Sequence, residues 1–311
     1  GALAPNAFAQ APYPNRQLQL IVPFPAGGPT DIVARLYAQQ LSKLAGQPVI
    51  VENVSGAAGI IGTQNAARAE PNGYTILFST ASTGVINQVI MKNLPYNFQK
   101  DFSMIALIAN APHLLVVNAN LPVKNLTELI ALAKKRPGEL TYGTSGNGGT
   151  GHVATEMFAQ QAGIKMMQVA YKGNAPATTD LVGGHIMLMF DQVSTSAGYI
   201  KSGRLRGLGV SSKKRSPLFP DMPTIDESGV KGFEDTTFNG LVAPAGTSRE
   251  ILEKLRSEVV KAVAVPVLRE RFEKNGIPLV ASNSLDEYNA FLRRHVEDFA
   301  KLAKTAGITA N

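Results

Sequence analysis

Strand and helix patterns alternate through most of this sequence, and that alternation most strongly limits its fold. The segment 18–24 (LQLIVPF) has the apolar and β-branched residues of a buried strand, and a stripe of apolar residues at helical spacing follows, ending at Gly46. Strands at 48–54 and 73–80 then flank a helix at 57–70. Such alternation predicts parallel sheets covered by helices, which is the α/β class.

The alternation resumes after a long apolar segment and a further helix. The apolar segment 103–117 contains Asn110, Pro112 and His113, and is too short to cross a bilayer, so it predicts a buried strand. Asn125 with Glu128 is a capping-box pattern that predicts the start of a helix. Strands are then expected at 140–145, 166–173, 185–190 and 205–212, with helices at 152–163, 175–184 and 194–203. A chain of 311 residues built this way predicts two domains.

Composition excludes several classes of function. The chain has no cysteine, which removes disulfides, thiolate nucleophiles and cysteine-ligated metals. The formal net charge is +7, but the basic clusters at 134–136 and 213–215 are short and carry no interleaved aromatic residues, so we expect no nucleic-acid partner. A basic surface of this kind still attracts small anions.

Two strand-to-helix turns are rich in glycine and contain neither Lys nor Arg between the strand and the start of the helix. They lie in VPFPAGGPTDIVARLY (22–37) and TYGTSGNGGTGHVATEMF (141–158). A helix beginning at such a turn has free N–H groups and a partial positive charge, which suits an anion. One helix end contributes about 0.3–2 kcal/mol, whereas a micromolar ligand needs about 8 kcal/mol. The pattern therefore indicates either simple tight turns or two halves of one binding cleft, and the matching context favours the cleft.

The same turns lack the residues of a nucleotide site or a catalytic centre. The first turn lacks G-x-G-x-x-G, and the second lacks the G-K-[ST] ending of a phosphate loop and has no lysine to meet phosphates, so no nucleotide cofactor is expected. Ser145 does not lie in a G-x-S-x-G elbow, and no base partner or metal-ligand spacing is visible. His152 could donate to a ligand or cap its own helix, while His113 is expected to be a satisfied buried residue. Asp31 is expected to cap or support its helix.

Two further strand ends are rich in hydroxyl and amide groups. Segments 78–88 (FSTASTGVINQ) and 189–196 (MFDQVSTS) end strands at the sheet edge where the glycine turns lie, and could orient a small polar ligand. For Ser82 and Ser196 a solvated turn is the alternative. Tyr171 ends another strand near the second glycine turn.

The N-terminal residues resemble the end of a secretory signal. Ala7-Phe8-Ala9 has the small-x-small pattern of a cleavage site and is followed by a proline-rich lead into the first strand. Residues 1–12 are therefore expected to be either a signal-peptide remnant or a flexible N-terminus.

Six segments together resemble the tripartite tricarboxylate transporter solute-binding proteins, also called the Bug family. They are PFPAGGPTDIVAR, VENVSGAAGIIG, YGTSGNGGTGHVATEMF, VAYKGNAPATTDLVGGHIMLMFD, LFPDMPTIDESG and VAPAGTS, in matching order from about Tyr13 onward. The resemblance implies a monomeric periplasmic binding protein without catalytic activity, with a two-lobed, type II-like "Venus flytrap" fold in which helices flank a mixed sheet in each lobe. Such a protein delivers a carboxylate to the permease subunits of a membrane transporter, or signals its presence to a membrane sensor.

The resemblance also implies lobe boundaries and site residues. Residues 13–112 with 240–311 would form one lobe and 113–239 the other, with crossings near 111–118 and 236–244. The ligand-binding residues implied are Phe24, Pro25, Ala26, Gly27, Gly28, Ser79, Thr80, Ser145, Gly146, Asn147, Gly149, Thr150, His152, Tyr171 and Asp191. Asp191 is the candidate to receive the amine of an amino-acid ligand. The ligand class stays open between a dicarboxylate, an aromatic acid and an acidic amino acid, and an α/β enzyme with an unrecognised site is the remaining alternative.

Overall fold

The computed structural model describes residues 13–306 and 308–309, so the predicted signal remnant at 1–12 lies outside the described residues. Within these described residues, nine strands form two sheet sections that share one long strand, β4 (Phe102–Asn118). In the first section β1 is parallel to β2 and β3, and β9 lies antiparallel between β3 and β4. Its other strands are β2 (Val49–Asn53), β1 (Leu18–Val22), β3 (Thr75–Thr80) and β9 (Thr236–Pro244).

The second sheet section is also mixed. β4 lies antiparallel to β7 and β8, while β5 runs parallel to β7 and β6. Its other strands are β8 (Leu205–Val210), β7 (Leu188–Gln192), β5 (Thr141–Thr144) and β6 (Met167–Ala170). The β-α-β order that was predicted from alternation is therefore present in both sections.

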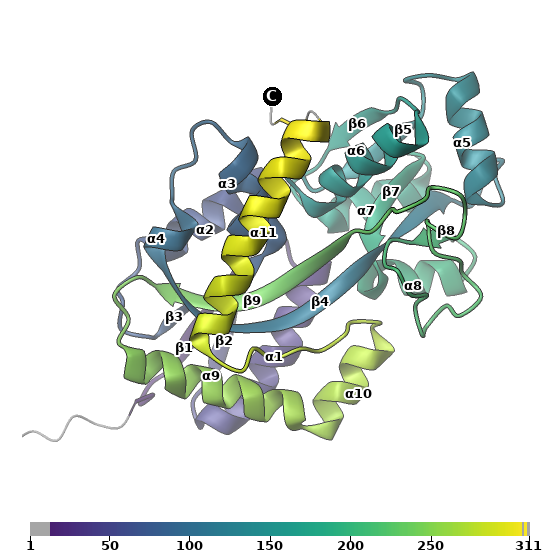
Figure 1. Ribbon diagram of the computed structural model, residues 1–311. Helices are drawn as coiled ribbons and strands as arrows, with labels where there is room; N and C mark the ends of the chain where they lie inside the picture. The colour runs from purple at the N-terminus through teal and green to yellow at the C-terminus, as the bar shows by residue number, and fades with distance from the viewer. Residues whose placement is uncertain (1–12, 307, 310–311) are drawn as a thin grey trace, which may run out of the picture.

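Strand β4 crosses from one section to the other within a single run of residues. Its pairing with β9 ends at Pro112, opposite Thr236, and its pairing with β7 begins at the next residue, His113. The two long strands β4 and β9 run side by side through the middle of the molecule in Figure 1. The prediction of one buried strand over 103–117 is confirmed, and the predicted lobe boundaries stay a prediction.

Helices cover both faces of the first section. α1 ends where Gly46 adopts a left-handed conformation with φ of 67°, as the glycine stop predicted. The interior between α1, α9 and the strands is a continuous apolar core. The helical segments around this section are α1 (Pro29–Ala45), η1 (Ala57–Gly59), α2 (Ile60–Ala67), η2 (Ser82–Ile86), α3 (Asn87–Ile90), α4 (Phe98–Asp101), α9 (Arg249–Ala264) and α10 (Pro266–Lys274).

The second section has its own helices. The backbone N–H of Glu128 donates to Asn125 Oδ1 at 2.9 Å, which confirms the predicted capping start of α5. The helices are α5 (Leu126–Lys135), α6 (Thr150–Ala162), α7 (Asn174–Gly183) and α8 (Val193–Lys201).

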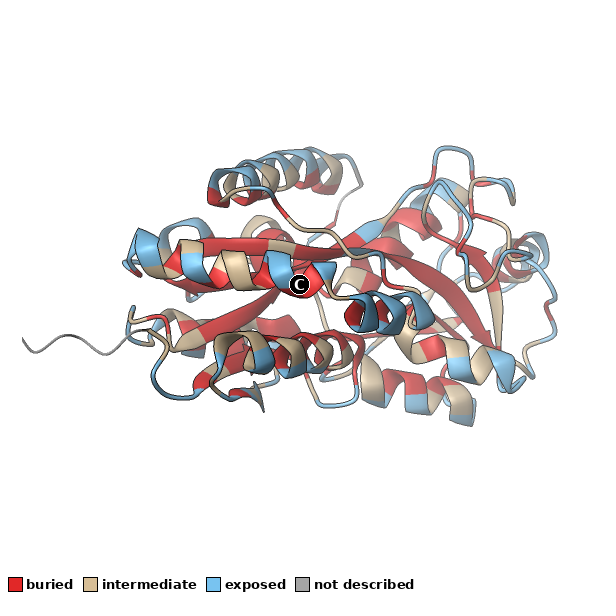
Figure 2. Ribbon diagram, turned by 90° about the horizontal axis from the view of Figure 1, so that it is seen from below, coloured by how far each residue is buried: buried red, intermediate tan, exposed pale blue. Residues whose placement is uncertain are grey.

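The last helix, α11 (Leu285–Ala306), lies along both sections (Figure 1). It packs on β4, η2 and α3, and also on α6 of the second section. Buried side chains from both sections and from α11 form one apolar cluster, and Figure 2 shows the strands buried between helical layers. None of the helices formed by the described residues has both the length and the hydropathy to span a bilayer.

Candidate functional site

A small polar cavity lies between the two sheet sections, where strands end and helices begin. We call it the cleft. The space open to the centres of water molecules in it is about 20 Å³, roughly what one water requires. The cleft is lined by Phe24, Pro25, Gly28, Pro29, Thr30, Thr80, Ser82, Ser145, Thr150, Asn174, Gln192 and Thr237.

Four helix N-termini meet at the cleft. α1 and α6 begin after Gly28 and Gly149, α7 begins at Asn174, and α8 begins after Gln192. None of these helix starts is capped by a side-chain hydrogen bond from its N-cap residue. The cleft therefore faces the positive ends of four helix dipoles and their first N–H groups. Its lining contains no Asp, Glu, Lys or Arg, so backbone dipoles dominate its immediate electrostatics.

The first glycine loop is held from behind by Asp31. The carboxylate accepts hydrogen bonds from the Gly27 N–H, Arg35 Nε and Asn53 Nδ2, each at 2.9 Å. Asn53 Nδ2 also donates to the Phe24 carbonyl at 3.0 Å. Burial on its own would raise the pKa of Asp31, but these three donors and the charge of Arg35 together lower it below its ordinary value. The expectation that Asp31 supports its helix agrees with this network.

The second glycine loop touches the other sheet section. A methyl group added at Gly146, where φ is 111°, would lie 3.5 Å from the Ala58 backbone nitrogen in η1. One added at Gly173 would overlap the ring of Pro25. The two sections are therefore closed on each other, and the loops meet across the cleft.

Asp191 supports the cleft without lining it. Its Oδ1 accepts from Asn174 Nδ2 at 2.8 Å, and its Oδ2 accepts from the hydroxyls of Thr178, Thr195 and Ser196 at 3.2, 2.6 and 2.7 Å. Its side chain is fully buried. All four donors are the protein's own, and one of them, Asn174, lines the cleft. Asp191 therefore holds the Asn174 side chain in place, and its role as the acceptor of a ligand amine stays a prediction.

His113 connects the crossing strands to the cleft. Its Nδ1 lies 2.5 Å from Asp235 Oδ2, and its Nε2 lies 3.1 Å from Thr150 Oγ1. The imidazole is completely buried, whereas 13% of the Asp235 side chain is exposed. The expectation of a satisfied, buried His113 is correct, but its partner Thr150 is a cleft residue.

Three other residues of the predicted ligand site make hydrogen bonds with groups outside the cleft wall. Ser79 donates to the Gly240 carbonyl at 3.1 Å and lies 2.9 Å from the Tyr288 hydroxyl, on the face covered by α11. His152 Nδ1 accepts the Gly148 N–H at 3.4 Å, and burial lowers its pKa although Glu156 opposes the change. Burial, together with donation to Asp180 at 2.7 Å, raises the pKa of Tyr171 to about 12.

The structure brings together part of the predicted set. Six predicted residues line the cleft: Phe24, Pro25, Gly28, Thr80, Ser145 and Thr150. Five belong to the two glycine loops but are not part of the wall: Ala26, Gly27, Gly146, Asn147 and Gly149. The remaining four, which turn away or lie behind the wall, are Ser79, His152, Tyr171 and Asp191.

Six lining residues lie outside the ligand set implied by the resemblance: Pro29, Thr30, Ser82, Asn174, Gln192 and Thr237. Of these, Ser82 and Gln192 belong to the two segments that were expected to orient a polar ligand. Asn174 carried a usable signal, since it follows a glycine where a strand turns into a helix. The solvated-turn alternative is wrong for both Ser82 and Ser196, which are 2% and 0% exposed.

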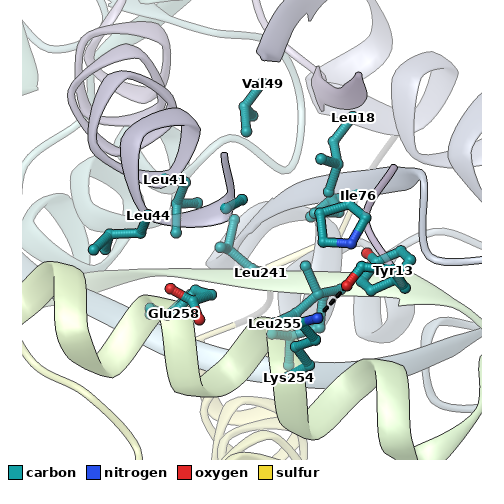
Figure 3. Close-up of a pocket in the computed structure, with 14 residues that line it drawn as sticks. Tyr13, Leu18, Leu41, Leu44, Val49, Ile76, Leu241, Lys254, Leu255 and Glu258 are labelled. Carbon is teal, nitrogen blue, oxygen red and sulfur yellow. Dashed lines mark hydrogen bonds between the residues drawn. The ribbon is translucent and has the colours of Figure 1, made fainter. Parts of the chain in front are cut away.

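A larger hollow of about 250 Å³ lies at the opposite ends of β1 and α1, between α1, α9 and the first sheet section. Figure 3 shows its wall of Leu, Ile and Val side chains, with Lys254 bonded to the Tyr13 carbonyl at the edge. It includes none of the predicted site residues. Because most of its wall is hydrocarbon, it offers few donors to an anion, and the cleft remains the candidate site.

Comparison with known proteins agrees with this geometry. A family model described as "Tripartite tricarboxylate transporter family receptor" matches residues 33–308. Protein BugT of Bordetella pertussis (strain Tohama I) is 34% identical over 297 residues, which cover 95% of this chain and 90% of BugT.

Solved structures are similar over nearly the whole chain. R. palustris Rpa4515 with adipate is 35% identical with a TM-score of 0.93, covering 96% of this chain and 99% of that one. MatC from Rhodopseudomonas palustris with bound malate is 28% identical with a TM-score of 0.89, covering 93% and 99%. These matches confirm the predicted α/β fold of a periplasmic binding protein. The chain belongs to the tripartite tricarboxylate transporter receptor family, which includes the Bug proteins.

Proposed function

We propose that this protein is a periplasmic receptor that captures a small carboxylate in the cleft and delivers it to the membrane permease of a tripartite tricarboxylate-type transporter. It acts as a monomer, binds without chemical turnover, and has lobes at 13–112 with 240–311 and at 113–239. The observation that carries the proposal is the meeting of four helix N-termini at a cleft whose wall has no charged side chain.

The number of helix N-termini determines whether their dipoles can supply the binding free energy of a micromolar ligand. At about 0.3–2 kcal/mol each, two helix ends fall short of the roughly 8 kcal/mol of a micromolar complex. Four bring the upper end of that range to the required value. Hydroxyl donors on the wall, such as Ser82 and Ser145, add to it.

The placement of the helices favours a dicarboxylate among the possible acids. α1 approaches from the first sheet section, whereas α6, α7 and α8 approach from the second. An anion with a carboxylate at each end is served by both sides, and the two similar proteins described above hold adipate and malate. An amine finds no free carboxylate on the wall, which disfavours an amino acid.

The closed cleft has space for about one water, so a carboxylate enters only when the two sections separate. The crossing strands β4 and β9 are the connections about which such a motion occurs. The proposal therefore includes opening and reclosure around the ligand.

A calorimetric titration with matched acids and amides tests the proposal. Adipate, malate and benzoate are each titrated into protein that has been refolded to remove bound ligand, alongside adipamide, malamide and benzamide. We expect at least one acid to bind with one-to-one stoichiometry and its amide to bind at least tenfold more weakly, since the amide is neutral. Equal binding of acid and amide, or no acid binding across a broader carboxylate panel, contradicts the proposal.

A pair of variants locates the site. Asn174→Ala removes a side chain from the cleft, whereas Asn125→Ala removes the cap of α5 and leaves the cleft unchanged. Asn125→Ala loses a helix cap and Asn174→Ala leaves the buried Asp191 with one donor fewer, so both lower stability. We expect only Asn174→Ala to weaken binding of the acid. The opposite pattern would place the site elsewhere.

A further inference from the structure

The hydrogen bonds of His113 fix where protons must be. Nδ1 and the Asp235 oxygen are 2.5 Å apart, and a carboxylate only accepts, so the proton between them belongs to Nδ1. Nε2 then has two options at its 3.1 Å contact with Thr150. In a neutral ring it accepts from the Thr150 hydroxyl, and in a charged ring it donates to it.

The two options present different groups to the cleft. When the ring is neutral, the single proton of the Thr150 hydroxyl is committed to His113, and its oxygen lone pairs are left to face a ligand. When the ring is charged, Nε2–H donates to the Thr150 oxygen, and the hydroxyl proton is free to turn into the cleft. A carboxylate is an acceptor, so it can accept a hydrogen bond from the Thr150 hydroxyl only in the second arrangement.

Ligand charge favours the same arrangement. An imidazolium next to the N-terminus of α6 faces the positive end of that helix, and Asp235 offsets it on the other side. A carboxylate arriving beside Thr150 adds a second negative charge in a buried site, where charge interactions are strong. Binding of the anion and protonation of the ring therefore support each other.

We propose that His113 is a proton-linked specificity residue: it takes up a proton when a carboxylate binds, and this turns the Thr150 hydroxyl into a donor to the ligand. The inference rests on the proposed function, because it requires a carboxylate in the cleft. In this proposal, Asp235 holds the imidazole ring in place. Each ligand binds as an anion, and the protein takes up one proton with it.

Other ionisable groups lie near the cluster of His113, Asp235 and Thr150. His152 accepts the Gly148 N–H at Nδ1, and burial lowers its pKa, which favours its neutral form. Glu234 is paired with Lys213 at 3.0 Å. The remaining groups near this cluster are Glu156 on α6, Asp191 on β7, and His295 and Asp298 on α11.

Calorimetry in two buffers measures the proton directly. The acid with the highest affinity in the panel is titrated at one pH in phosphate and in Tris, whose ionisation enthalpies differ. The difference in observed enthalpy gives the number of protons taken up per ligand. We expect uptake of up to one proton by the unsubstituted protein and none by His113→Gln, in which the amide can still bridge Asp235 and Thr150.

The pH profile gives a second readout. For one proton taken up, the dissociation constant rises by up to about tenfold per pH unit on the alkaline side, and this slope should flatten in His113→Gln. Thr150→Val, which removes the hydroxyl and retains the shape, should also lose the proton uptake. His185→Gln is the matched control, since His185 lies exposed in the turn before β7, and it should bind and take up protons as before.

The outcomes separate the two proposals. If no acid binds, the proposed function fails. If the acid binds but the enthalpy is the same in both buffers, or proton uptake persists in both His113→Gln and Thr150→Val, the role of His113 is refuted while the receptor function stands. The hydrogen bonds that run from Thr150 through His113 to Asp235 also match the nucleophile, base and acid arrangement of a hydrolase triad. Ester hydrolysis that disappears in Thr150→Val would therefore replace the ligand-donor role with a nucleophile.

Discussion

The replacement Asp191→Asn separates support of the cleft from contact with a ligand. The carboxylate accepts one amide N–H bond through Oδ1 and three hydroxyl bonds through Oδ2. An asparagine keeps the shape but has one oxygen. Its amide nitrogen fits best in the Oδ1 position, where it meets the Asn174 NH₂ group and no bond forms.

The magnitude follows from those four bonds. One buried donor loses its acceptor, which costs about 1–3 kcal/mol. The three hydroxyl bonds lose their charge-assisted strength, which adds about 1 kcal/mol. We expect Asp191→Asn to lower the free energy of unfolding by about 2–4 kcal/mol, measured by urea denaturation followed by circular dichroism.

Asp191→Asn should weaken the affinity for ligand by a smaller free energy than it lowers stability, and the loss should be the same for every class of ligand. Asn174 loses its fixed orientation, and one hydrogen bond to a ligand is worth about 0.5–1.5 kcal/mol, so affinity should fall about threefold to tenfold. In an Asn174→Ala background, Asp191→Asn should weaken binding little further, since the effect passes through Asn174. Unchanged stability with loss of binding for amino acids alone would refute this reasoning and place Asp191 on the ligand.

Three further predictions concern the loop, its support and the face behind it. Gly27→Val should weaken acid binding at least tenfold, whereas Gly203→Val, with a similar φ of 73° against 77° and equally open surroundings, should cost similar stability and leave affinity unchanged. Asp31 has a lowered pKa in the folded protein. Its contribution to stability is therefore present above its unfolded pKa of about 3.9 and is lost as the pH falls through the lower folded value. In Asp31→Asn, the free energy of unfolding should consequently fall less steeply as the pH is lowered. Ser79→Ala should cost about 1 kcal/mol by losing the bond to Tyr288, with calorimetric affinity unchanged; loss of binding would show that Ser79 faces the ligand.

The helix starts at the cleft were accessible from sequence because their signals are local. A strand that ends in glycines and continues as an amphipathic helix places its turn at the carboxyl edge of a parallel sheet, whatever the rest of the chain does. Gly28 was found in this way, whereas Ser145 and Thr150 of the second turn were implied by the family resemblance, and all three lie on the cleft wall. The other helix starts, at Asn174 and Gln192, follow the same rule but lack a glycine-rich run.

The direction of individual side chains was not accessible. Ser79 and Thr80 are neighbours on β3, and alternation along a strand sends them to opposite faces, so only Thr80 lines the cleft. Which face is which depends on where α11 packs, some 209 positions away at Tyr288. Segment composition carries no information about that contact.

His113 shows the same limit at greater separation. Its partners Asp235 and Thr150 lie 122 and 37 positions away along the chain. They meet because β4 and β9 cross between the sheet sections together, which is a property of strand order. No spacing pattern in the sequence connects these three residues.

The path of α11 has a consequence for how affinity is set. This helix packs on both sheet sections, and Gln160 Nε2 of α6 donates to the Thr305 carbonyl at 3.3 Å. Under the opening and reclosure proposed above, contacts between α11 and α6 favour the closed state even before a ligand arrives, and the apparent dissociation constant scales inversely with the closed fraction. When the closed state is a minor population, about 1.4 kcal/mol of packing on this distant surface is worth a factor of ten. Natural variation along the C-terminal helix can thus change the solute concentration to which the receptor responds, while every residue around the solute stays the same.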